Sequence, residues 1–152
     1  MRIGIDPGNT GAIALVSGSK LVSLSDMPLM ANGKKQQINA AELASIVEDM
    51  KLIGGEVTAV VERVAAMPGQ GVSSMFNFGM GYGVIQGVLA ATGTPYILVT
   101  PQAWKKEAGL ISKDKDMART LAQQLFPDAP LARKKDIGRA DAILIAHFGM
   151  KP

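Results

Sequence analysis

The chain has 152 residues, of which 47% are hydrophobic and 19% charged, a composition that supports one folded domain and excludes a disordered chain. It contains no cysteine and a single histidine, so disulfide frameworks, thiolate metal centres and multi-histidine zinc sites are excluded. A bound metal would need carboxylate ligands, which favour Mg²⁺ or Mn²⁺, and the net charge of +3 is a mild bias toward polyanionic partners.

The first third of the chain predicts three strands joined by tight turns, followed by a helix. The predicted strands are Arg2–Asp6, Ala12–Val16 and Leu21–Ser25. A polar loop is expected over Met27–Gln37. A helix is expected from Asn39, with Glu42 completing a capping box, to about Ile53 before two glycines.

The remainder alternates strands and helices, which predicts an α/β fold with a mixed sheet flanked by helices in one domain, 1–152. The predicted strands are the β-branched run Val57–Val61 and the segment Tyr96–Val99. The predicted helices begin at Ser73 or Ser74, at Thr100-Pro101 and at Ser112, and the last covers Ile137–Phe148.

Three of the thirteen acidic residues lie next to apolar segments, where removing a charge from water costs free energy. Asp6 ends the first apolar strand, Glu62 ends the buried strand, and Asp141 lies within an otherwise apolar helix. Each alone has an ordinary explanation as a turn cap, a solvent-facing strand end or the partner of a basic residue such as Arg139. Together, with few basic neighbours, they indicate a shared cation and two-metal phosphoryl transfer, in which the metals sit about 4 Å apart.

Charge is unevenly distributed along the chain. Residues 1–101 carry a net charge of −1 and residues 102–140 a net charge of +4, which predicts a basic face for a phosphate backbone. Between Arg63 and Lys105 lie 41 uncharged positions. Because glycine and proline interrupt this run, no membrane span is expected, and no signal peptide is recognised.

Three motifs carry a family resemblance. Gly4-Ile5-Asp6-Pro7-Gly8-Asn9-Thr10-Gly11, Val60-Val61-Glu62 and Ala140-Asp141-Ala142-Ile143-Leu144-Ile145-Ala146 resemble, in order and spacing, the acidic motifs of RuvC-type Holliday junction resolvases. These enzymes belong to the RNase H-like superfamily. The resemblance covers essentially the whole chain and implies the RNase H-like fold, with a five-stranded mixed sheet of three antiparallel and two parallel strands.

The resemblance implies a homodimer that binds four-way or other branched DNA and nicks two like-polarity strands. It implies two Mg²⁺ ions per active site, replaceable by Mn²⁺, bound by Asp6, Glu62 and Asp141. Lys105 resembles the basic residue that the family places near the scissile phosphate, and Lys115 falls where a second functional lysine is expected. The ordinary alternative for Lys105, Lys106, Lys113 and Lys115 is a solvated basic face.

Two departures from the family pattern matter. The last motif usually carries two acidic residues three apart, but here the earlier position is Gly138. Asp136 is the nearest substitute, either as a fourth metal ligand or as a helix cap. The aromatic wedge expected after Glu62 is also missing, and its role falls to Met67 or Phe76, or is absent.

The uncharged run itself divides into a loop and a helix. The loop residue Met67 and the polar residues Gln70, Ser73, Ser74 and Asn77 are expected to contact DNA. Gly79, Gly83 and Gly87 recur every fourth residue, and glycine costs about 1 kcal/mol per helix position, so something must approach this face closely. That neighbour is either the chain's own sheet or, as the resemblance implies, a second subunit.

Other function classes remain open. The turn after Asp6 also resembles the phosphate loop of actin-like ATPases and sugar kinases, but those need two such domains, and no nucleotide cofactor is expected. The alternatives are a ribonuclease H acting on RNA–DNA hybrids or branched DNA, and a non-catalytic nucleic-acid-binding relative. The expected location is the cytoplasm, or the host cytoplasm if the chain is encoded by a bacteriophage.

Overall fold

A five-stranded mixed sheet forms the centre of the molecule in a computed structural model that describes residues 1–150. The last two residues of the domain expected over 1–152 lie outside the described residues. The strand order is β3-β2-β1-β6-β7, with antiparallel β3-β2-β1 pairing and parallel β1-β6-β7 pairing. The strands are β1 (Arg2–Asp6), β2 (Ala12–Ser17), β3 (Lys20–Asp26), β6 (Thr58–Glu62) and β7 (Tyr96–Val99). This sheet confirms the predicted topology.

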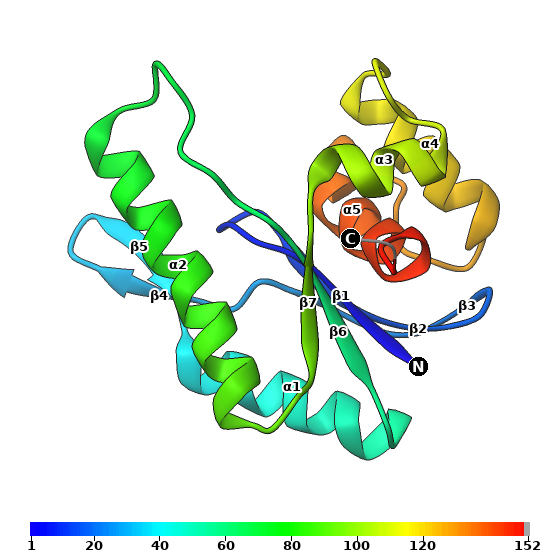
Figure 1. Cartoon of the computed structure of the whole chain (residues 1–152), viewed down its shortest axis with the longest axis horizontal. Coiled ribbons are helices and arrows are strands. Elements are labelled where there is room, and N and C mark those ends of the chain that lie inside the picture. The colour runs from blue at the N-terminus through cyan, green and yellow to red at the C-terminus, as the bar shows by residue number, and fades with distance from the viewer. Residues whose placement is uncertain (151–152) are drawn as a thin grey trace.

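Helices cover both faces of the sheet (Figure 1). One face carries two of them and the other carries three, together with a short 3₁₀ turn. They are α1 (Ala40–Gly54) and α2 (Val72–Ala91) on the first face, and α3 (Pro101–Ala108), α4 (Lys115–Leu125), η1 (Lys134–Asp136) and α5 (Ile137–Phe148) on the second. The bounds of α5 are those predicted from the sequence.

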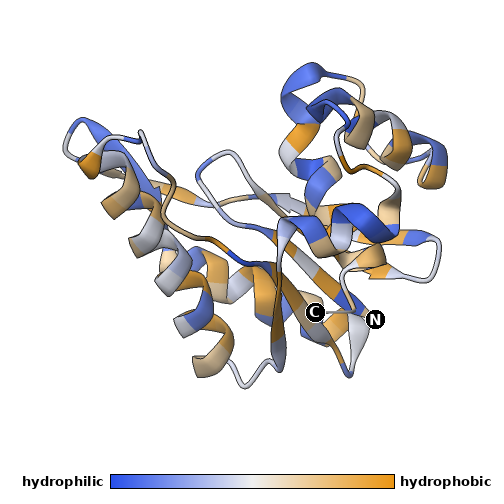
Figure 2. Ribbon diagram, turned by 45° about the horizontal axis from the view of Figure 1, so that its top comes forward, coloured by the Kyte–Doolittle hydropathy of each residue, from blue (hydrophilic) through white to orange (hydrophobic). Residues whose placement is uncertain are grey.

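Two hydrophobic cores result, one on each face. Ile3 and Ile5 of β1 point into the core with α1 and α2, whereas Ala14 and Val60 belong to the core with α5. Figure 2 shows the apolar colour running along the central strands, while the tip of the β4–β5 hairpin and much of the α3–α4 region are hydrophilic. Because successive side chains of a strand point to opposite faces of the sheet, the same strands contribute residues to both cores.

Besides α5, two predicted helix starts are confirmed by their caps and two are corrected. Asn39 Oδ1 accepts from the backbone N–H of Glu42 at 3.1 Å, and Thr100 Oγ1 caps α3 in the same way. However, α2 begins at Val72, before Ser73 and Ser74. Helix α4 is capped by Asp114 and not by Ser112, whose φ of 61° is unsuitable for an N-cap.

The loop expected over Met27–Gln37 is instead largely a β-hairpin, which corrects the prediction. Strands β4 (Leu29–Asn32) and β5 (Lys35–Ile38) pair antiparallel as a separate two-stranded sheet. Gly33 has a φ of 63° at the first central position of the two-residue turn, where glycine suits a type II′ arrangement. The hairpin lies beside α2 (Figure 1).

The glycine row of α2 faces away from the protein's own sheet. A Cβ atom added at Gly79, Gly83 or Gly87 would meet no atom within 4 Å among the described residues. The same side of the helix exposes Phe76 (72%) and Val72 (88%). Packing on the chain's own sheet therefore does not explain the row. Within residues 1–150 no helix has the length and apolarity to cross a membrane.

Candidate active site

The three out-of-place carboxylates meet at one edge of the central sheet. Asp6 and Glu62 end the adjacent parallel strands β1 and β6, which pair in register with Ile5 opposite Val61. Helix α5 packs directly on β1 because Gly4 has no side chain, and a Cβ there would lie 2.0 Å from the carbonyl oxygen of Ala142. This close approach brings Asp141 to the same edge.

The three carboxyl groups are largely buried, and Asp6 and Asp141 are also affected by the charges of other members of the group. Burial raises the pKa of Asp6 well above its ordinary value, and repulsion from Asp141 and Glu62 raises it further. Burial and then repulsion from Glu62 raise the pKa of Asp141 to about 7. The pKa of Glu62 is also raised, chiefly by burial. Such a cluster of perturbed carboxylates is a feature of functional sites.

Two lysines lie within electrostatic range of this cluster. Lys105 on α3 and Lys115, the first residue of α4, each lower the pKa of Asp6 and of Asp141, although burial and carboxylate repulsion outweigh them. The structure thus brings together all five residues to which the sequence analysis gave catalytic roles. Lys115 is exposed and Lys105 half-buried, so both can be reached from solvent.

Trp104 is a site residue that sequence reasoning missed. Its side chain is fully buried, and its indole N–H donates a 2.7 Å hydrogen bond to Glu62 Oε2. The Nζ atom of Lys105 lies 5.6 Å from the centroid of the Trp104 ring, a cation–π distance. The one tryptophan of the chain, directly before a predicted catalytic lysine, was the available signal.

Asp136 is not brought to the carboxylate cluster. Its buried carboxylate accepts from the guanidinium of Arg133 at 2.8 Å and from the backbone N–H of Arg133 at 2.9 Å, and Arg139 lies 3.7 Å away. The hydrogen bonds from the Arg133 side chain hold the pKa of Asp136 below its ordinary value. These contacts stabilise the start of α5 and give no support to a metal role. Its carboxylate makes no side-chain N-cap hydrogen bond to α5 either.

The structure also explains why the last motif lacks its earlier acidic residue. A Cβ atom at Gly138 would lie 2.1 Å from the carbonyl oxygen of Thr10, in the turn that follows Asp6. Any side chain at position 138 would have to displace that turn. In this chain, α5 and the β1–β2 turn pack so closely at position 138 that no acidic side chain fits there.

The donor chemistry of the cluster fits a hard divalent cation, because three carboxylates with few competing cations provide oxygen ligands and negative charge. Among residues 1–150, no three His, Asp or Glu side chains already have the spacing of a metal site. Metal binding would therefore require side-chain movements that draw the three carboxylates together.

The residues predicted to contact DNA surround this edge on two sides. On one side, α3 and the segment into α4 present the exposed Lys106 and Lys113. On the other, the loop before α2 exposes Met67 and Gln70, and the first turns of α2 expose Ser73 and Ser74. Asn77 is half-buried, and its side-chain amide donates to the carbonyl of Gln36 in β5 at 3.4 Å.

Comparisons with known proteins bear on this arrangement. No family model matches the chain. The chloroplast Holliday junction resolvase MOC1 of Chlamydomonas reinhardtii is 35% identical over 97 residues, covering 59% of this chain. The matched stretch spans only 10% of the algal protein.

Solved structures of Thermus thermophilus RuvC share the fold. RuvC in complex with a Holliday junction substrate aligns with a TM-score of 0.66 and 16% identity, over 97% of this chain and 90% of that chain. A second structure of Thermus thermophilus RuvC aligns with a TM-score of 0.58 and 18% identity, over 97% and 91% of the two chains. The chain therefore has the fold of the RuvC Holliday junction resolvases, and the resemblance predicted from its three acidic motifs is confirmed.

Proposed function

We propose that the protein is a metal-dependent endodeoxyribonuclease that resolves four-way DNA junctions by paired nicks, one from each protomer of a homodimer. The observation that carries this proposal is the meeting of Asp6, Glu62 and Asp141, from β1, β6 and α5, at one sheet edge, where burial raises the pKa of each. The RuvC fold and the resolvase relative support the junction as substrate.

The three carboxylates would hold Mg²⁺, or Mn²⁺ in its place. When bound there, two such ions would supply an activated water and stabilisation of the leaving oxygen of the phosphodiester. The carboxylates orient the ions and offset their charge, which requires each carboxyl group to lose its proton. The raised pKa values make proton release part of metal binding.

The lysines provide the complementary charge for DNA. Lys105, supported by the ring of Trp104, is suited to pair with the phosphate that is cleaved. Lys115 faces the same carboxylates from the start of α4. Lys106, Lys113 and the loop before α2 contribute contacts to the backbone on either side, which raise affinity without reading sequence.

The outward face of α2 supports the homodimer. Its glycine row lets a second helix approach closely, and exposed Phe76, Val72 and Met80 would be covered by it. A two-fold dimer through this face would set a constant spacing between two active sites, as paired nicking requires.

A synthetic mobile four-way junction with Mg²⁺ tests the proposal. We expect symmetric paired nicks with the unchanged protein and at least a hundredfold loss with Asp6→Asn, Glu62→Gln or Asp141→Asn. The exposed loop variant Asp128→Asn is the matched control and should cleave normally. Full activity in the three site variants would overturn the proposal, and preferential cleavage of an RNA–DNA hybrid would establish the ribonuclease H alternative.

A further inference from the structure

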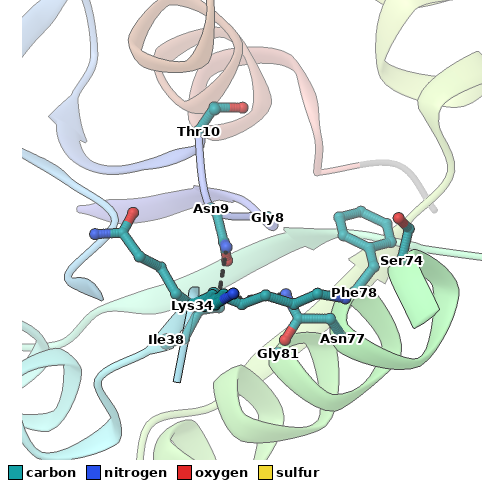
Figure 3. A pocket seen from close by; sticks show the side chains of 11 residues that line it. Gly8, Asn9, Thr10, Lys34, Ile38, Ser74, Asn77, Phe78 and Gly81 are labelled. Carbon is teal, nitrogen blue, oxygen red and sulfur yellow. Dashed lines mark hydrogen bonds between the residues drawn. The ribbon is translucent and has the colours of Figure 1, made fainter. Parts of the chain in front are cut away.

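A cavity of about 890 Å³ opens next to the turn that follows β1 (Figure 3). Three elements form its walls: the turn after β1, the β4–β5 hairpin and the first turns of α2. Its functional groups come from Asn9, Thr10, Lys34, Lys35, Ser74 and Asn77. Neither the hairpin nor its lysines were assigned a role from the sequence.

Hydrogen bonds connect the hairpin to the other two walls of this cavity. The backbone carbonyl of Gln36 accepts from Asn9 Nδ2 at 3.0 Å and from Asn77 Nδ2 at 3.4 Å. Lys35 Nζ donates to the hydroxyl of Ser73 at the start of α2. The hairpin is therefore braced between the active-site turn and α2, with Lys35 bonded to α2 and Lys34 among the residues that line the cavity.

The chemistry of the lining matches a phosphodiester backbone. It combines two ammonium groups with hydroxyl and amide donors, and no Asp or Glu lines the cavity among the described residues. Binding sites for drug-sized molecules are mostly apolar, whereas DNA backbone sites combine cations with neutral donors. The ring of Phe78 adds one flat apolar wall, which suits a sugar or base.

The cavity also lies where substrate must pass. Asn9 is three residues after Asp6, a span of at most roughly 11 Å, which a DNA strand covers in about three nucleotides at about 3.4 Å each. Figure 1 shows the hairpin and α3 on opposite sides of the carboxyl ends of β1 and β6. DNA held at both places would cross the carboxylates.

On the basis of the proposed nuclease function, we propose that this cavity binds the backbone of the DNA strand close to the cleaved phosphate, with Lys34 and Lys35 as its phosphate ligands. The lysine-bearing hairpin is then a second DNA clamp, opposite the basic α3–α4 segment. It orients the strand from the side of Asp6, whereas Lys105 and Lys115 act from the other side.

Junction binding without cleavage, in Ca²⁺, tests the clamp. Dissociation constants are measured by fluorescence anisotropy over a series of KCl concentrations for the unchanged protein and for Lys34→Ala, Lys35→Ala and the double variant. Each lost phosphate contact should reduce the magnitude of the slope of the logarithm of the association constant against the logarithm of the KCl concentration by about 0.9. The double variant should bind the junction roughly tenfold more weakly at low salt. Lys35→Arg should keep the slope.

The control is Lys20→Ala, an exposed lysine at the distant β2–β3 turn, which should leave the slope and affinity unchanged. An unchanged slope in the double variant, while the unchanged protein binds and cleaves junctions, would overturn the clamp alone. Absence of junction binding by the unchanged protein would overturn the proposed function and the clamp together. Saturable binding of inorganic phosphate, lost in the double variant, with no change in DNA affinity would show a free-anion site and also overturn the clamp.

Discussion

Trp104 connects the hydrophobic core to the chemistry of the site. Its buried ring fixes α3 against the core, its N–H fixes one oxygen of Glu62, and its face lies near Lys105. One side chain therefore positions an acidic and a basic group of the site. Partners of this kind orient metal-binding carboxylates, and their loss typically costs about 10–100-fold in metal affinity or activity.

Trp104→Phe should weaken metal use while leaving the fold intact. The phenyl ring retains most of the buried apolar surface but loses the hydrogen bond that lowers the pKa of Glu62. Protons then compete more strongly for Glu62, so we expect half-maximal cleavage to need roughly tenfold more Mg²⁺. The pH–rate profile should also shift to higher pH. Single-turnover cleavage over Mg²⁺ and pH series measures both effects, and superimposable curves would contradict a positioning role.

Asp141 makes the metal-free protein less stable as pH rises. Its folded pKa of about 7 lies above the ordinary value of 3.8, so between these values the folded state holds a proton that the unfolded state has lost. Stability therefore falls as pH increases through this window. Asp141→Asn should raise the free energy of unfolding at pH 8 by roughly 1–3 kcal/mol and change it little at pH 4. Denaturant unfolding in EDTA at both pH values checks this, and an equal gain at pH 4 would contradict it.

Gly138→Asp restores the acidic pair of the family pattern but should not restore a ligand. The new Cβ would overlap the carbonyl of Thr10 and displace the turn that follows Asp6. We expect a loss of about 2 kcal/mol or more in stability, and slower cleavage. Gly138→Ala is the matched variant, because it adds the Cβ without a charge and should lose similar stability. Faster cleavage by Gly138→Asp would show that the turn yields and that a fourth carboxylate is accommodated.

At the scale of elements, the parts that carry the carboxylates are predictable because their sequence patterns are local. The apolar runs before Asp6 and Glu62 predict strands, and the apolar helix around Asp141 has the predicted bounds. The β4–β5 hairpin was missed because its strands are short and mostly exposed and β5 is mostly polar, although Gly33 provided a turn signal.

The contacts between elements could not be predicted in the same way. The bond from Trp104 to Glu62 joins residues 42 positions apart, and the pairing of Asp136 with Arg133 depends on a local 3₁₀ turn. The first contact arises only when α3 docks on the sheet, whereas the second is local and depends on the conformation of the turn before α5. This is why Asp136 was a reasonable candidate ligand from its position, whereas its contacts are those of a structural charge.

A large side chain in the glycine row of α2 should prevent the proposed dimer from forming through this helix. Gly83 has open space around it, so Gly83→Arg fits the monomer and also removes a helix glycine worth about 1 kcal/mol. We therefore expect a monomer by sedimentation velocity, with unchanged or higher thermal stability. Ser45→Arg, an exposed position on α1, adds the same charge as a control and should stay dimeric. A dimeric Gly83→Arg protein would exclude this face as the seam.

The molecule as a whole places its acidic edge between two positively charged regions. The basic segment of residues 102–140 lies on one side, and the hairpin with Lys34 and Lys35 on the other. The proposed dimer face on α2 is separate from the carboxylates, although the helix and the site share the loop that follows Glu62. Dimerisation and DNA binding can therefore act through different surfaces of one small domain.

Paired nicking by a dimer makes a prediction about mixed subunits. When the unchanged protein is co-assembled with Asp6→Asn subunits carrying a different tag, purified heterodimers have one working site. On a cruciform-containing supercoiled plasmid, the unchanged dimer should give linear product, because both strands are cut within one binding event. The heterodimer should give nicked circles, because its second strand must await another dimer. If protomers act independently, the heterodimer should instead form linear product by the same course as the unchanged dimer, at about half its rate. Agarose gel electrophoresis over time distinguishes the two outcomes.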